Sequence, residues 1–155
     1  MKLRVLFLCA TNGLHSPMAE ALLGRMDSQH FEAVSAGTSC GRLHPFTVEV
    51  MKEIGIDLAG NTPKPIQELT DNEFDYVITL GESSGFHRLT VRSAEIVHWK
   101  FDDLIAGPND PEKQLRAFRI VRDQIAQRLR LFVIVHVRQR TPGPGTTFSK
   151  AARAR

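Results

Sequence analysis

Cysteine is scarce in this chain of 155 residues, which contains only Cys9 and Cys40. Two cysteines cannot form the disulfide framework of a small secreted domain. Apolar runs are also short, and none reaches the roughly 18 residues that a membrane-spanning helix requires. These absences exclude disulfide-rich and membrane-spanning proteins. We therefore expect a cytoplasmic location, in which both cysteines are thiols.

Acidic residues are absent from the end of the chain. The stretch 137–155 carries a charge of +5, whereas the whole chain carries only +3, so the rest is mildly acidic. This stretch contains two Pro-Gly pairs and forms helices and strands poorly. We predict one domain over residues 1–136 and a flexible basic tail over residues 137–155. Phe148 is the one aromatic residue among these charges, and no groove-reading helix is predicted, which argues against nucleic acid as a partner.

Two common patterns of ligand-binding sites are missing as well. No G-x-G-x-x-G follows the first apolar run, so no dinucleotide site is predicted. The two cysteines and six histidines show none of the spacings of metal sites. We therefore predict neither a bound metal nor a bound cofactor.

Strand-like and helix-like patterns alternate along the chain. Short apolar runs predict strands over residues 3–8, 31–36, 76–80 and 95–99. Helical spacing predicts helices over residues 17–26, 44–54 and 111–132, with a short helical turn over 64–69. The run 131–137 is rich in β-branched residues, and it predicts either the packed end of the last helix or an extended segment.

This order of elements predicts the α/β class. We expect a single doubly wound domain, with a four-stranded parallel sheet and helices on both faces. Ligands of such sheets bind beyond the carboxyl ends of the strands. The loops that begin at Cys9, Gly37, Gly81 and Lys100 should therefore share one rim.

Cys9 ends the first predicted strand and precedes a loop and a helix. The N–H groups of such a loop, together with the positive end of the helix, can hold an anion and favour a thiolate. Gly13 lets the loop backbone approach a ligand, and Asn12 tolerates a left-handed conformation. Ser16 can place a hydroxyl near the sulfur or cap the helix. A buried, unreactive cysteine is the alternative interpretation.

The stretch from Val5 to Glu20 resembles the phosphate loop of the low-molecular-weight protein tyrosine phosphatases and of their relatives, the thioredoxin-coupled arsenate reductases. The family pattern is Cys, two residues, Asn, two residues, Arg and Ser, often followed by Pro-Met-Ala-Glu. Other similar segments follow in the family's order: Ser35-Ala36-Gly37-Thr38, His44 to Asp57, and Phe74 to Thr79. The segment from His98 to Asp103 is similar to the arsenate reductase branch.

This resemblance implies a reaction and a set of site residues. Cys9 would be the nucleophile, Ser16 would stabilise its thiolate, and Asp103 would be the acid. The oxyanion would be bound by the loop, which comprises Ala10, Thr11, Asn12, Gly13, Leu14 and His15. The implied activity is thiol-dependent reduction of arsenate to arsenite. Its partners would be a small oxyanion, arsenate or phosphate, and an external thiol reductant, namely thioredoxin, glutaredoxin or a small-molecule thiol.

Two other functions remain open. The first is hydrolysis of phosphotyrosine or another phosphomonoester by Cys9 and Asp103. The second is a non-catalytic module that binds an oxyanion or a partner. The second alternative rests on residues that depart from the family pattern.

Three positions show these departures. His15 stands in place of the family arginine, and histidine is shorter and charged only below its pKa. Gly81 stands in place of a relay cysteine, and residues 82–90 contain no cysteine, so the three-thiol cascade of the relatives cannot operate. Leu104 replaces a proline, and Asp102 is the alternative to Asp103 as the acid.

Cys40 is the one thiol left besides Cys9. It follows the second predicted strand and is a candidate resolving thiol for an oxidised or arsenylated Cys9. A loop cysteine without a role is the alternative.

Overall fold

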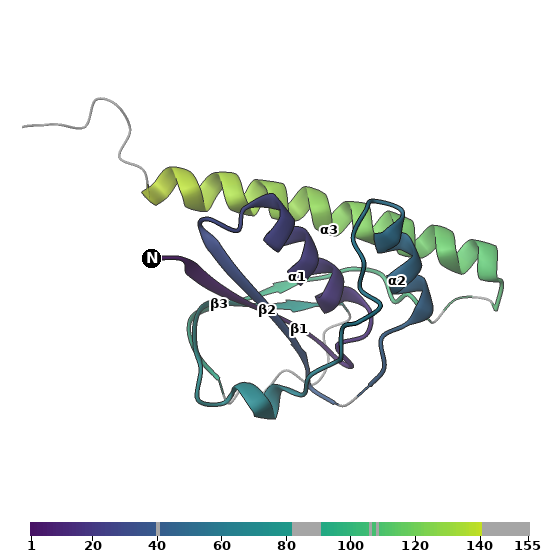
Figure 1. Ribbon diagram of the computed structural model, residues 1–155, viewed down its shortest axis with the longest axis horizontal. Coiled ribbons are helices and arrows are strands. Elements are labelled where there is room, and N and C mark those ends of the chain that lie inside the picture. Colours follow the sequence, from purple (N-terminus) through teal and green to yellow (C-terminus); the bar gives the residue numbers. More distant parts are fainter. Residues whose placement is uncertain (40, 82–90, 106, 108, 141–155) are drawn as a thin grey trace, which may run out of the picture.

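Four parallel strands form the centre of the protein (Figure 1). The computed structural model describes residues 1–39, 41–81, 91–105, 107 and 109–140. The strands are β1 (Leu3–Cys9), β2 (Phe31–Gly37), β3 (Glu73–Leu80) and β4 (Arg92–Trp99), and their order in the sheet is β2-β1-β3-β4. All three pairings are parallel. The predicted α/β class and its four-stranded parallel sheet are therefore confirmed.

Three α-helices, α1 (His15–Met26), α2 (Pro45–Lys52) and α3 (Pro111–Arg140), lie on one side of the sheet in Figure 1. The 3-10 helix η1 (Ile66–Leu69) lies on the other side. Val5 and Phe7 of β1 pack in the core with the α-helices, whereas Leu6 and Leu8 pack in a second core with Ile66. Because both faces of β1 are covered, its sequence is a continuous apolar run rather than an alternating one.

Several elements are longer than their patterns predict. α1 begins at His15 rather than at residue 17, and β3 and β4 begin at residues 73 and 92 rather than at 76 and 95. These differences lie at element ends, where hydrogen bonds to neighbouring segments, rather than local pattern, decide the boundary.

The largest difference concerns the end of α3. The run 131–137 is helical, because Phe132 packs against the rings of Phe31, Tyr76 and Trp99 with centroid distances of 5.6, 5.4 and 6.0 Å. Tertiary packing of this kind overrides a weak local preference for strand. Residues 137–140 of the predicted tail therefore belong to the helix, and residues 141–155 lie outside the described part. Charged residues interrupt α3, and no helix among the described residues could cross a membrane.

A cluster of charged groups joins α2 to α3. Glu53 accepts hydrogen bonds from Arg119 at 2.7 Å and from Arg122 at 2.9 Å. Arg122 is 9% exposed and also donates to the carbonyl oxygen of Val50 at 2.8 Å. The Arg119 hydrogen bond, reinforced by Arg122, lowers the pKa of Glu53. The two helices are thereby held together beside the rim of the sheet.

We predict that Glu53→Gln lowers the free energy of unfolding at neutral pH. A carboxylate with a lowered pKa stabilises the folded state above its unfolded pKa of about 4.3, and this contribution is lost as the pH falls through the folded pKa. The variant should therefore differ from wild type at pH 7 and converge with it in acid. Urea unfolding across pH measures this. Glu68→Gln, at an exposed position of η1, is the matched control, and an equal loss in both variants would contradict the prediction.

Candidate active site

Four loops meet at the carboxyl end of the sheet, as predicted. The loop after β1 receives hydrogen bonds from the loop after β2, since Thr38 N–H donates to the Cys9 carbonyl at 3.1 Å and Ser39 N–H to that of Ala10 at 2.8 Å. His15 contacts Gly81 after β3 and Asp102 after β4. The rim therefore brings residues from all four strand ends around Cys9, which is itself only 3% exposed.

The loop 10–14 has its carbonyl groups turned outward. Besides Cys9 and Ala10, Gly13 uses its carbonyl oxygen to accept from His44 N–H and the Thr47 hydroxyl, each at 3.0 Å. In the part of the chain that the structure describes, no acceptor is recorded for the N–H groups of residues 11–14. A row of free N–H groups at the start of a helix is an anion-binding arrangement.

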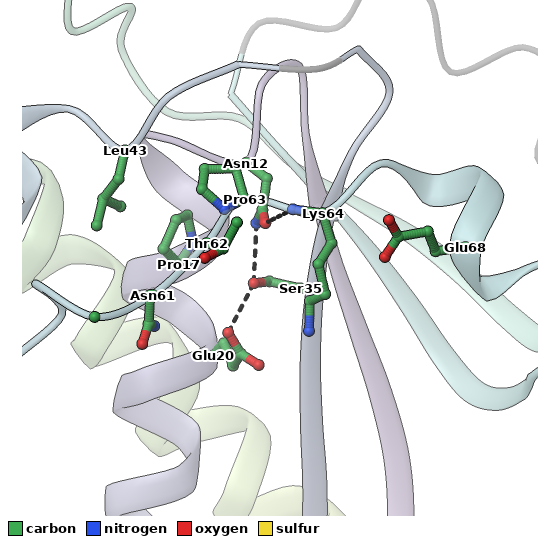
Figure 2. A pocket seen from close by; sticks show the side chains of 11 residues that line it. Asn12, Pro17, Glu20, Ser35, Leu43, Asn61, Thr62, Pro63, Lys64 and Glu68 are labelled. Carbon is green, nitrogen blue, oxygen red and sulfur yellow. Dashed lines mark hydrogen bonds between the residues drawn. The ribbon is translucent and has the colours of Figure 1, made fainter.

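The side chain of Asn12 holds this loop in place from behind (Figure 2). The backbone of Asn12 has a left-handed conformation, with φ of 57°. Its amide group donates to the hydroxyls of Ser16 and Ser35 at 2.8 and 2.9 Å, and its oxygen accepts from Lys64 N–H at 2.9 Å. Ser35 in turn donates to Glu20 at 2.8 Å. The start of α1 and two segments distant in sequence thus fix one loop residue.

The hydroxyl of Ser16 lies against the thiol. Ser16 Oγ is 2.9 Å from Cys9 Sγ, and both side chains are buried. Asn12 donates to one lone pair of Ser16 Oγ, and the hydroxyl proton can be donated to a Cys9 thiolate. A donor at this position stabilises a thiolate rather than a thiol.

A polar cavity of about 500 Å³ lies behind the loop, beside the Asn12 network. Figure 2 shows Glu20, Ser35 and Lys64 along it. Within the described residues, no group of three or more His, Cys, Asp or Glu side chains gathers as a metal site would require.

His15 is the first residue of α1 and is 5% exposed. Its Nε2 lies 3.2 Å from the carbonyl oxygen of Asp102, and its ring stacks on Phe101 at 6.2 Å with an interplanar angle of 19°. Burial lowers the pKa of His15, although the Asp102 bond and the charge of Asp103 act in the opposite direction. The ring is therefore neutral at pH 7, unlike an arginine in the same place.

The two aspartates of the late loop have different surroundings. Asp102 uses its backbone carbonyl to bind His15, whereas Asp103 Oδ1 accepts from Ile105 N–H at 3.0 Å. Both side chains are exposed, and the negative charge of Asp103 acts on the ring of His15. Asp103 is thus the carboxyl group that is electrostatically linked to the site.

Sequence reasoning missed several contacts of this site. The partners of Asn12 at Lys64 and of His15 at Asp102 are 52 and 87 residues away, so no local pattern could indicate them. The Ser35-Ala36-Gly37 segment could have indicated the contact with Asn12. Ser35 Oγ accepts a hydrogen bond from the Asn12 side chain, and Gly37 packs so closely that a β-carbon there would lie 2.8 Å from the Asn12 backbone nitrogen. Cys40, the candidate resolving thiol, lies outside the described residues.

The close packing of Gly13 gives a test of the loop. A β-carbon on Gly13 would lie 2.1 Å from the carbonyl oxygen of Arg42, whereas one on Gly24 in α1 would have no atom within 4 Å. We predict that Gly13→Ala costs about 1–3 kcal/mol of stability and weakens phosphate binding. Gly24→Ala, the matched control, should add about 0.5–1 kcal/mol. Chemical denaturation measures both, and an undiminished stability of Gly13→Ala would contradict the prediction.

The hydroxyl of Ser16 gives a second test. We predict that Ser16→Ala slows iodoacetamide alkylation of Cys9 at pH 7 by about tenfold, the value of one charge-assisted hydrogen bond. Peptide mass spectrometry measures the alkylation rate of each cysteine separately, because trypsin cleaves after Arg25 and so places Cys9 and Cys40 on different peptides. Ser28→Ala, at an exposed position beyond α1, is the control. Equal alkylation rates in the two variants would refute the role of the hydroxyl.

Fold and site together define a class of protein. It is an α/β protein in which a buried thiol ends the central strand β1 and lies against a loop of free N–H groups at the start of α1. N–H groups in this arrangement can bind a tetrahedral oxyanion next to the thiol.

The chain belongs to the low molecular weight phosphotyrosine protein phosphatase family, whose model matches residues 4–141. It is 34% identical over 129 residues to an arsenate reductase of Halalkalibacterium halodurans, covering 83% of this chain and 93% of that one. It is 30% identical over 128 residues to a glutaredoxin arsenate reductase of Synechocystis, covering 81% and 92%. The predicted family is confirmed, and the arsenate reductase branch is consistent with these relatives.

Solved structures agree with this assignment. An arsenate reductase in the phosphate-binding state has a TM-score of 0.69 and 31% identity to this chain, covering 86% of this chain and 98% of that one. An arsenate reductase from Archaeoglobus fulgidus has a TM-score of 0.61 and 28% identity, covering 79% and 96%.

Proposed function

We propose that this protein reduces arsenate to arsenite with Cys9 as its nucleophile and an external thiol as its reductant. The observation that carries the proposal is the pairing of a buried thiol with the Ser16 hydroxyl at 2.9 Å, beside a loop with free N–H groups. The arsenate reductases among its relatives support the choice of arsenic over phosphorus.

The reaction proceeds in two stages. The Cys9 thiolate attacks arsenic, an As–S bond forms, and one oxygen leaves as water after protonation. An external thiol then attacks the Cys9 sulfur, so that a disulfide forms while the electron pair of the As–S bond reduces arsenic and arsenite leaves. A second thiol regenerates Cys9. One arsenate and two thiols thus give arsenite, one disulfide and one water.

The reductant is external because the chain offers no relay thiol after β3. Gly81 occupies that place with φ of 95°, a conformation that a cysteine would adopt only with strain. Residues 82–90 contain no cysteine. A reducing compartment such as the cytoplasm would supply thioredoxin, glutaredoxin or a small-molecule thiol, and Cys40 is the remaining candidate for an internal resolving step.

The decisive experiment measures arsenite formed from arsenate with each of these three reductants in turn. Turnover with at least one of them, together with a mixed disulfide trapped on Cys9, is the expected result. A folded protein that binds phosphate but forms no arsenite with any reductant would refute the proposal and leave phosphomonoester hydrolysis or the non-catalytic oxyanion-binding module.

Phosphomonoester hydrolysis is a second candidate, favoured by the charge of Asp103 beside the site. A phosphatase needs an acid for the leaving oxygen, and an exposed carboxyl on the late loop can supply it. The test is para-nitrophenyl phosphate hydrolysis by Asp103→Asn beside Asp102→Asn. A selective loss in Asp103→Asn would support this activity, and absence of hydrolysis in wild type would exclude it for this substrate.

A further inference from the structure

The hydrogen bond of His15 determines which of its nitrogens carries the proton. Its partner, the Asp102 oxygen at 3.2 Å, is a backbone carbonyl and can only accept. Nε2 must therefore carry the proton in the neutral ring. Nδ1 then holds a lone pair and acts as an acceptor, whereas an arginine in this place would offer only donors.

The lone pair of Nδ1 has room beside it. Gly81 lies beside this edge of the ring, and a β-carbon there would be in contact with Nδ1 and Cε1 at 3.4 Å, so glycine leaves free the space that a side-chain carbon would fill. Among the described residues, none donates a hydrogen bond to Nδ1, and no side-chain nitrogen or oxygen is both fully enclosed and unpartnered. Nδ1 is therefore the accessible polar atom of this ring.

His15 also directly follows the free N–H groups of the loop. Consecutive residues before and at the start of α1 thus supply donors for deprotonated oxygens and an acceptor for a hydroxyl group. An oxyanion that carries a hydroxyl satisfies both, whereas one without a hydroxyl places an oxygen lone pair against that of Nδ1.

We propose that His15 makes the oxyanion site selective for anions that carry a hydroxyl group, such as hydrogen arsenate and hydrogen phosphate, over anions that carry none, such as sulfate. This inference rests on the proposed function, because it assumes that the loop beside Cys9 binds the oxyanion. Sulfate and phosphate are nearly the same size, so the hydroxyl is what separates them. A site with an unpaired buried polar group rejects the analogue that lacks the matching group.

Protonation of His15 removes the selectivity. Phe101 and Gly81 carry no charge, Asp102 contributes its carbonyl, and Asp103 is the charged group that acts on the ring. Because burial lowers the pKa of His15, the ring is neutral at pH 7.5 and gains a proton on Nδ1 only in acid. Nδ1 then becomes a donor and accepts sulfate as readily as phosphate.

Calorimetric titration with inorganic phosphate and with sulfate tests this proposal. Wild type at pH 7.5 should bind phosphate about tenfold or more tightly than sulfate. The ratio should fall toward one in His15→Arg at pH 7.5, and in wild type as acid protonates the ring of His15. His30→Arg, which adds a charge before β2 at the opposite end of the sheet, should retain the discrimination at pH 7.5, which assigns the discrimination to the ring of His15.

The outcomes separate the two proposals. Equal binding of sulfate and phosphate by wild type at pH 7.5 overturns the selectivity of His15 and leaves the oxyanion loop intact. A wild-type ratio that stays the same once acid has protonated the ring, as followed by NMR of the imidazole, also overturns it, even where His15→Arg fails to fold. If neither anion binds to wild type at pH 7.5 or in acid, nor protects Cys9 from iodoacetamide, the oxyanion loop itself is rejected.

Discussion

Replacing Cys9 with serine is expected to abolish arsenate reduction while leaving phosphate binding intact. Serine is nearly isosteric and can keep the hydrogen bond to Ser16, which spans 2.9 Å in the native protein. A hydroxyl, however, stays protonated at neutral pH and cannot form the disulfide on which the electron transfer depends. Loss of a nucleophile of this kind costs about 10⁴-fold or more in rate.

The measurement is arsenite formation with excess thiol, beside phosphate affinity by calorimetry. Cys40→Ser is the matched control, because it is the same exchange at the chain's other cysteine. A Cys40→Ser variant that is slow with a small thiol but not with thioredoxin would support a resolving role. Full activity with both reductants would exclude that role, and turnover by Cys9→Ser would contradict the nucleophile assignment.

Replacing His15 with arginine is expected to raise kcat/KM for arsenate by about 10²–10³-fold, the value of one charged transition-state donor. The native ring is neutral at pH 7 because burial lowers its pKa. A guanidinium is charged at every accessible pH and can hold two oxyanion oxygens at once. Gly81, which lies beside this position, has no side chain.

The activity gain should be specific to this position. His30→Arg is the matched control, since His30 precedes β2 at the opposite end of the sheet and pairs with Asp27. Steady-state kinetics with both variants, after thermal unfolding has established that they are folded, provides the test. A folded His15→Arg variant with unchanged or lower kcat/KM would show that the neutral ring is already the better partner for arsenate.

The sequence predicted those features of the structure that neighbouring residues determine. The run from Val5 to Leu8 indicated a strand covered on both faces, and both cores contain it. The adjacency of Cys9 to the loop and the start of α1 indicated the anion site. Residues 131–137 were ambiguous, because their helical state depends on Phe132 meeting three rings from other elements.

The protonation state and hydrogen-bonding role of His15 could be inferred only from the fold. From sequence, the residue was only a substitution for arginine, and its charge state was open. The partner that fixes its proton lies 87 residues away, and the glycine that leaves its other nitrogen accessible lies on a third strand end. Neither contact leaves a periodic pattern, since both arise from the order of strands in the sheet.

The long reach of these contacts has a consequence for the order in which the protein matures. During synthesis, β1 and Cys9 emerge early, but Lys64 and Asp102, which complete the surroundings of Asn12 and His15, follow 52 and 87 residues after those partners. Contacts between such distant segments form late in folding. Cys9 is thus synthesised before the segments that complete the hydrogen bonds around its loop, and the oxyanion site that we propose is assembled only when those later segments have folded against it.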